Sequence, residues 1–99
     1  MLLHTVNKAP AQGQALELCL RFASSQDKVL LIEDGVNAAV ADSASFRTLL
    51  ATANPQILVL QPDLASRGLA DKLAPGLQTI DYQGFVALCC QCDKTQSWF

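Results

Sequence analysis

Short apolar runs alternate with amphipathic segments along this chain. Four apolar runs predict β-strands, at residues 2–6, 29–32, 57–60 and 77–80. The second and third runs contain no alternating polar residues, which is typical of strands buried on both faces of a parallel sheet. The pattern therefore favours a parallel sheet that is covered by helices on both sides.

The segments between the runs have the spacing of helices. The clearest is at residues 14–24, where Leu16, Cys19, Leu20 and Ala23 follow each other at i, i+3, i+4 and i+7. We expect this stripe to face the sheet. On this basis alone, Cys19 is a buried core residue.

Turn and capping residues mark the other helices. A short helix is expected after Asp34 and Gly35, and residues 82–93 form the last helix. The remaining expected boundaries are Ser43 as an N-cap, residues 54–55 as a stop, Asp63 as an N-cap and Gly68 as an end. This order predicts a three-layer αβα single domain over residues 1–99. Its sheet is mostly parallel and largely buried, with about four or five strands.

The first helix also carries apolar side chains outside the stripe that faces the core. Leu18 and Phe22 widen its apolar arc to about 200°, at about 100° per residue, which is more than one sheet face covers. We expect these two side chains to meet another subunit. A neighbouring helix of the same domain is the alternative that the sequence leaves open.

Composition supports the idea of subunit contacts and excludes other partners. Hydrophobic residues make up 51% of the 99 residues and charged residues only 16%, and so small a domain hides this much apolar surface with difficulty. The formal net charge is −2 and the Lys and Arg residues are scattered, so we expect no direct nucleic-acid binding. No run is long enough to span a membrane, and no signal peptide is evident. A cytoplasmic protein with free thiols is expected.

Three of the four cysteines, Cys89, Cys90 and Cys92, lie within the expected last helix. Helical spacing places Cys89 in one apolar stripe with Tyr82, Phe85 and Val86, which predicts a buried and inert thiol. A zinc site would need His4 and Cys19 as distant further ligands, and the C-terminal end of a helix disfavours a thiolate. A metal or redox module built on these cysteines remains an alternative.

No other position offers a self-sufficient active site. Glycine-rich loops do not follow the expected strands, so neither a nucleotide nor another cofactor is expected. His4 lies in mid-strand and is expected to be a satisfied core histidine. Polar residues lie at the carboxyl ends of the strands, where catalytic residues of open α/β sheets gather; they are Asn7, Glu33, Asp34, Gln61, Asp63 and Asp81. Paired acids there could bind a cation or accept a phosphoryl group, but the acid pair and lysine of a receiver domain are missing, and residues 33–35 are expected to form a turn and helix cap.

An ordered set of segments resembles the DsrH/TusB family over the whole chain. The segments are LHTVNKAP at residues 3–10, LLIEDGVNAAV at 30–40, LQPDLASRGL at 60–69 and IDYQGFVALC at 80–89, with QSWF at the end. The resemblance implies a subunit of a cytoplasmic sulfur-relay complex of the TusBCD or DsrEFH type. In such a complex, persulfide sulfur passes between carrier proteins, either for 2-thiolation of the tRNA wobble uridine or for sulfur oxidation.

The resemblance also implies the partners. The other subunits are a DsrE/TusD-like chain, which bears the principal persulfide cysteine, and a DsrF/TusC-like chain, in a hexamer that contains each of the three chains twice. A TusA-like protein donates the sulfur and a DsrC/TusE-like protein accepts it. This chain is then mainly structural. Whether it forms a homo-oligomer when it is made alone is left open by the sequence.

Cys19 is the candidate sulfur carrier that the resemblance offers. Some DsrH members have a cysteine in the first helix, in a stretch similar to LELCLRFAS here, and members of the tRNA pathway lack it. A direct persulfide sulfurtransferase with Cys19 as its nucleophile is therefore the alternative to a structural subunit.

Overall fold

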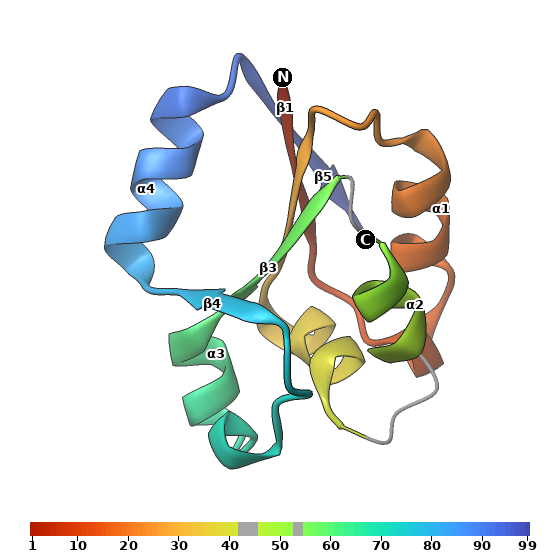
Figure 1. Ribbon diagram of the computed structural model, residues 1–99, viewed down its shortest axis with the longest axis vertical. Helices are drawn as coiled ribbons and strands as arrows, with labels where there is room; N and C mark the ends of the chain where they lie inside the picture. The colour runs from red at the N-terminus through yellow and green to blue at the C-terminus, as the bar shows by residue number, and fades with distance from the viewer. Residues whose placement is uncertain (42–45, 53–54) are drawn as a thin grey trace.

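The computed structural model describes residues 1–41, 46–52 and 55–99. Within them, five strands form one parallel sheet in the order β4-β3-β2-β1-β5 (Figure 1). The strands are β1 Leu2–Val6, β2 Lys28–Leu31, β3 Gln56–Leu60, β4 Gln78–Ile80 and β5 Lys94–Trp98. The predicted α/β class with a parallel, layered sheet is confirmed.

Helices connect the strands on both faces of the sheet. The α-helices are α1 Ala15–Phe22, α2 Phe46–Ala51, α3 Gln61–Ser66 and α4 Tyr82–Gln91. Short 3-10 helices are η1 Pro10–Gln12, η2 Glu33–Ala39 and η3 Ala70–Lys72. In the parts of the chain that the model describes, no helix is both long and apolar enough to cross a membrane.

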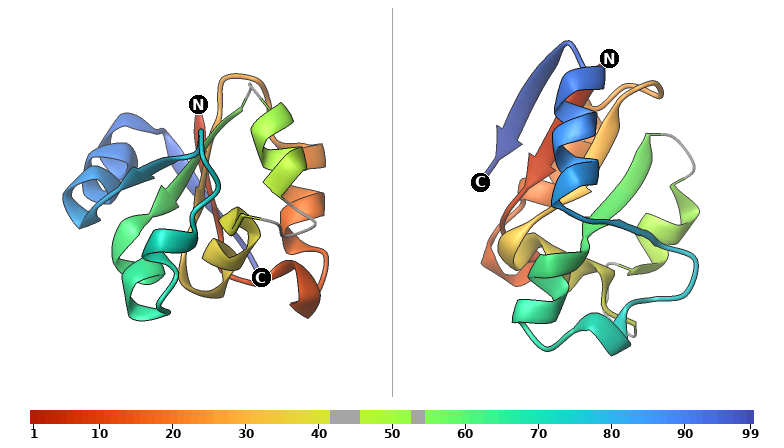
Figure 2. Two further views of the ribbon diagram at one scale, coloured as in Figure 1. Left: turned by 60° about the horizontal axis from the view of Figure 1, so that its bottom comes forward. Right: turned by 90° about the vertical axis from the view of Figure 1, so that its left-hand side faces the viewer.

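Alternate residues of the central strands fill two separate cores. Val29 and Leu31 of β2 point to the face that α1, α2 and η2 cover. Leu30 points to the opposite face, where it packs with Leu88 and Cys92. Figure 1 shows α1 and α2 on one side of the sheet and α4 on the other, and in the right-hand view of Figure 2 α4 crosses in front of the sheet. This alternation explains why the second and third apolar runs carry no polar residues.

β5 is the element that the hydrophobic pattern did not locate. It pairs with β1 over residues 94–98, on the side of β1 away from β2. Its first four residues are exposed and polar, because it is an edge strand whose backbone bonds, rather than apolar side chains, hold it in place. The path through α4 therefore returns the chain from one sheet edge, β4, to the other.

Of the two predicted ends of α3, the structure confirms the one at Gly68 and not the cap at Asp63. Asp63 does not cap α3, which starts at Gln61 directly after β3, and its carboxylate instead accepts a hydrogen bond from the backbone N–H of Glu33 at 2.6 Å. Gly68 does lie just past α3, with φ of +68°. The expected cap at Ser43 lies outside the described residues.

The orientation of α4 differs from the prediction for Cys89. Phe85, Leu88 and Cys92 pack against the sheet, whereas Cys89 is exposed. Gly84 explains the rotation of the helix, because a Cβ there would lie only 3.0 Å from Cβ of Ile80. The glycine side of α4 can therefore approach β4 closely, and the stripe that includes Cys89 turns outward.

Candidate functional site

Cys19 lies on the inner face of α1 and is fully buried. Burial, the larger effect, and the negative charge of Asp27 together raise the pKa of its thiol to about 12. The thiol is therefore protonated at neutral pH. Since the thiolate is the nucleophilic form of cysteine, Cys19 is inert in this conformation.

Asp27, which raises the pKa of Cys19, belongs to a polar network with His4 and Trp98. Nε2 of His4 lies 2.8 Å from Oδ2 of Asp27, and the indole N–H of Trp98 donates to Nδ1 of His4 at 3.1 Å. An indole N–H can only donate, so Nδ1 accepts and the proton of the neutral ring is on Nε2, where it is donated to Asp27. His4 is the satisfied core histidine that the sequence predicted. With both ring nitrogens engaged, it is not free to act as a general base.

Asp27 is the charged centre of this network. Burial opposes ionisation of its carboxyl group, but hydrogen bonds from His4 and from the backbone N–H groups of Leu2 and Ser24 outweigh that effect and lower its pKa. The network joins β1, the loop before β2 and, through Trp98, the edge strand β5. Its role in the structure is to anchor β5 to the core.

The cysteines of α4 lie in two different environments. Cys89 and Cys90 are exposed, and Cys92 is buried with a pKa that burial raises. The prediction that Cys89 is buried is wrong. The helix has two apolar sides, and the side with Phe85 and Leu88 packs against the sheet, not the side with Cys89. Within the described residues, no group of three or more His, Cys, Asp or Glu side chains is placed to hold a metal ion.

The acidic residues at the carboxyl edge of the sheet hold loops together. Asp34 accepts a hydrogen bond from Nε of Arg67 at 3.1 Å and another from Nε2 of Gln12 at 3.2 Å. Arg67, followed by Gln12, keeps the pKa of Asp34 below its usual value. Glu33 has a φ of +49°, and its backbone is tied to Asp63. These contacts agree with the predicted role of the segment at residues 33–35 as a turn and helix start.

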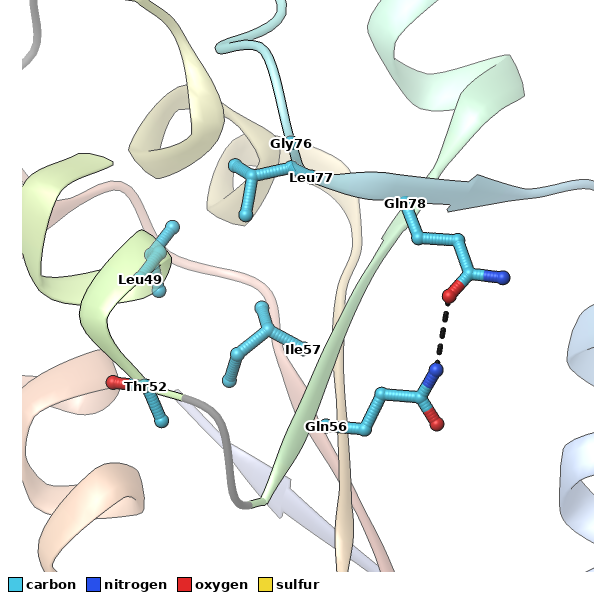
Figure 3. A pocket seen from close by; sticks show the side chains of 7 residues that line it. All are labelled: Leu49, Thr52, Gln56, Ile57, Gly76, Leu77 and Gln78. Atoms are coloured by element: carbon cyan, nitrogen blue, oxygen red, sulfur yellow. Dashed lines mark hydrogen bonds between the residues drawn. The ribbon is translucent and has the colours of Figure 1, made fainter.

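A cavity of about 180 Å³ opens beside the amino ends of β3 and β4 (Figure 3). Its lining consists of Leu49, Thr52, Gln56, Ile57, Gly76, Leu77 and Gln78. In Figure 3 the side chains of Gln56 and Gln78 face each other, and Nε2 of Gln56 donates to Oε1 of Gln78 at 2.9 Å. The hydroxyl of Thr52 donates to the backbone carbonyl of Thr48 at 2.6 Å. The described part of the lining is therefore aliphatic, amide and hydroxyl in character, and none of its side chains is ionisable for acid–base chemistry.

Leu18 and Phe22 are exposed on α1, as the sequence predicted. Leu18 is 43% exposed and Phe22 is 64% exposed. The ring of Phe22 lies 5.6 Å from that of Trp98 and 6.1 Å from that of His4, between ring centroids. We call Leu18, Phe22 and Trp98 the α1 surface. This apolar area lies next to the network, because the ring of Phe22 packs near those of His4 and Trp98.

Fold and site define a small parallel α/β domain with an inert buried thiol and exposed apolar side chains. Comparison with known proteins gives a family. Residues 8–95 match the family model described as "DsrH like protein". "Protein TusB" of Yersinia pestis (strain Pestoides F) is 35% identical over 98 residues, with 98% of this chain and 100% of the relative covered. The chain belongs to the DsrH family, as the sequence resemblance indicated.

Two further comparisons agree. "Protein TusB" of Enterobacter sp. (strain 638) is 33% identical over 97 residues, covering 98% of this chain and 100% of the relative. The crystal structure of the ychN protein from E. coli matches with a TM-score of 0.74 over 97% of each chain. Its sequence is 16% identical, so this likeness concerns the fold alone.

Proposed function

We propose that this chain is a mainly structural subunit of a cytoplasmic sulfur-relay complex of the TusBCD type, which serves 2-thiolation of the tRNA wobble uridine. Membership of the DsrH family supports the sulfur-relay role. The full-length likeness to proteins named TusB favours the tRNA pathway over sulfur oxidation. The partners are a TusD-like and a TusC-like chain in a hexamer, a TusA-like donor and a TusE-like acceptor.

The state of Cys19 is the observation that carries the structural role. Accepting a persulfide sulfur requires a thiolate that the donor can reach. Cys19 is fully buried, and burial together with the charge of Asp27 raises its pKa to about 12. Cys19 therefore serves packing in the proposed complex, and the persulfide cysteine is on the TusD-like chain, as the family resemblance implies.

The α1 surface is the proposed contact with a sister subunit. An exposed Phe beside a half-buried Trp is typical of the centre of an interface, where large rigid side chains bind a partner. Leu18 extends the same area along α1. A negative charge at Leu18 would have to be buried on assembly, so Leu18→Glu should weaken the complex far more than it weakens the fold.

The test is complementation of a host strain that lacks this gene, with tRNA 2-thiouridine quantified by mass spectrometry. Cys19→Ala is expected to restore thiolation and Leu18→Glu to restore less than about a tenth of it, since a tenfold loss corresponds to 1.4 kcal/mol of binding. Gln14→Glu adds the same charge at an exposed position at the start of α1 and serves as the control. Thermal melting of each purified variant separates loss of assembly from loss of fold.

A complex that assembles normally with Cys19→Ala yet makes no 2-thiouridine would contradict the structural role. That result would establish the alternative, a direct persulfide sulfurtransferase with Cys19 as nucleophile. Full activity of Leu18→Glu would instead show that the α1 surface is not part of the interface.

A further inference from the structure

Two thiols lie within one turn at the C-terminal end of α4. Cys89 and Cys92 have the spacing i and i+3, so their side chains are neighbours on the helix surface, with about 5–6 Å between the Cβ atoms. Cys90 is two residues from Cys92 and therefore lies about 160° away from it round the helix. Cys89 and Cys92 thus form a dithiol pair to which Cys90 does not belong.

The two thiols of this pair differ in accessibility. Cys89 is exposed. Cys92 is only 7% exposed and packs with Leu30 and Leu88 in the core on this face of the sheet. A dissolved reagent or a carrier protein therefore reaches Cys89 first, and Cys92 reacts with a group that is already attached to the end of α4. An exposed cysteine beside a second, less accessible one is the arrangement of an attacking and a resolving thiol.

Two positive charges lie near the buried thiol. The ammonium group of Met1 pairs with the carboxylate of Asp93 at 2.8 Å, and the N–H of Asp93 donates to the carbonyl of Met1 at 3.0 Å. Figures 1 and 2 show the N-terminus beside the turn that follows α4. Burial, the largest effect, raises the pKa of Cys92, whereas the Met1 ammonium and Lys28 lower it. These cations oppose the two effects that disfavour a thiolate here, namely burial and the C-terminal end of the helix dipole.

The end of α4 can bring the two sulfur atoms into bonding distance. The charge of Cys89 also raises the pKa of Cys92, so the two thiols are within electrostatic range of each other. A disulfide needs about 3.5–4.5 Å between the Cβ atoms, roughly 1–2 Å less than the regular helical spacing. Tightening the last turn to 3-10 geometry, which is common at helix ends, aligns the side chains at i and i+3. Cys92 already has extended backbone angles, φ −91° and ψ 147°, so no helix on its C-terminal side resists this change.

We propose that Cys89 and Cys92 are a sulfide-releasing dithiol, in which Cys89 takes the outer sulfur of a persulfide and Cys92 displaces that sulfur as hydrogen sulfide. The substrate class is a persulfide, R–S–SH, and the products are the thiol R–SH, hydrogen sulfide and a Cys89–Cys92 disulfide. The proposal rests on the proposed function, which supplies persulfide sulfur, and adds a side branch that this function does not require. The branch removes sulfur that no acceptor has taken from the complex.

Both steps are exchanges between a thiolate and an S–S bond. In the first, the thiolate of Cys89 attacks the outer sulfur of R–S–SH, the S–S bond breaks and R–S⁻ leaves. In the second, the thiolate of Cys92 attacks Sγ of Cys89, the newly formed S–S bond breaks and HS⁻ leaves. The outer sulfur gains two electrons, the two cysteine sulfurs lose one each, and the two thiol protons end on R–SH and on hydrogen sulfide. A thiol reductant such as glutathione returns the pair to the dithiol by the same kind of exchange.

Reaction of the reduced full-length chain with glutathione persulfide tests the pair. Under anaerobic conditions the chain is expected to release sulfide above the background of the reagent and to acquire an intrachain disulfide, located by peptide mass mapping. Cys92→Ala should release about tenfold less sulfide and keep the added sulfur on Cys89. Cys89→Ala should abolish both the release and the disulfide. Cys90→Ala removes the neighbouring exposed thiol and is the matched control, which should behave as the unmodified chain.

Thermal melting shows which variants are folded. Cys89 is exposed, so Cys89→Ala decides the point even where Cys92→Ala, a change in the core, fails to fold.

The outcomes separate the dithiol pair from the proposed function. A persulfide that stays on Cys89 of the unmodified chain, sulfide release that Cys92→Ala or Cys89→Ala leaves unchanged, or a disulfide that contains Cys90 overturns the proposal. A parallel reaction with the persulfidated sulfur-carrier protein of the host shows which persulfide is the source, and release with neither donor also overturns the proposal. All these measurements use the chain alone, so the proposed function is still decided by assembly and by tRNA 2-thiouridine.

Discussion

At the residue scale, the environment of Cys19 explains why a cysteine can be retained in a sulfur-relay family without reacting. Burial of the side chain and the ionised carboxylate of Asp27 both oppose thiolate formation. The sequence predicted burial of Cys19 from helical spacing. It could not predict the raised pKa, because Asp27 reaches this region from a loop that carries no periodic pattern.

Thiol reactivity tests this environment. In the folded chain at pH 8, iodoacetamide is expected to modify the exposed Cys89 and Cys90 at least about 100-fold faster than Cys19, since Cys19 is buried and its raised pKa keeps its thiol protonated. In denaturant all four cysteines should react alike. Rapid alkylation of Cys19 in the native state would show that α1 opens readily, and would revive its role as a carrier.

Acid sensitivity tests the network around His4. The folded-state pKa of Asp27 is below its unfolded value of about 3.9, so the ionised group stabilises the fold above that pH and the contribution is lost as pH falls. Asp27→Asn should lower stability at pH 7 by about 1–3 kcal/mol, because it removes a charged hydrogen-bond acceptor. Its free energy of unfolding should then fall less steeply between about pH 5 and pH 2.

Urea denaturation at several pH values gives this slope. Asp71→Asn removes an exposed carboxylate and is the control, which should keep the slope of the unmodified protein. Equal slopes for Asp27→Asn and the unmodified protein would mean that Asp27 does not hold the network as described.

At the element scale, the sequence predicted strands and helices wherever an apolar run or stripe was present. The first four strands and the first and last helices lie where the pattern placed them, with shifts of one or two residues. β5 was not located, because an exposed edge strand held by backbone hydrogen bonds has no hydrophobic signal. The sequence predicted the wrong side of α4 to be buried, because that helix carries two apolar stripes. Gly84, which allows close approach to Ile80, was the available signal.

Gly35 lies where η2 approaches β1 too closely for any side chain. A Cβ on Gly35 would overlap the backbone carbonyl of Val6, where η2 crosses the end of β1. Gly35→Ala should therefore cost more than about 3 kcal/mol, above the usual range for overpacking. Gly68→Ala is the matched control: its Cβ meets nothing within 4 Å, and only its φ of +68° opposes alanine, at about 1–2 kcal/mol.

Urea denaturation of both variants decides this point. The predicted result is a much lower midpoint for Gly35→Ala than for Gly68→Ala, or a failure of Gly35→Ala to fold. Similar midpoints would mean that η2 and β1 can separate at little cost.

At the scale of the whole molecule, exposed apolar side chains lie on both sides of one sheet, because α1 and α4 pack on opposite faces. The α1 surface lies beside β5, and the exposed side chains of Tyr82 and Val86 lie on the other layer. A 99-residue chain with 51% hydrophobic residues is difficult to keep soluble unless such surfaces are covered. This arrangement is what the proposed role predicts for a subunit that completes an assembly and leaves the sulfur chemistry to a neighbour.

The most direct test of that role is native mass spectrometry of this chain purified from its own host under mild conditions. The account predicts a complex in which this chain occurs together with two different chains of similar size, in equal numbers, and carries no added sulfur on Cys19. A chain that is isolated alone, or that carries a persulfide on Cys19, would contradict it.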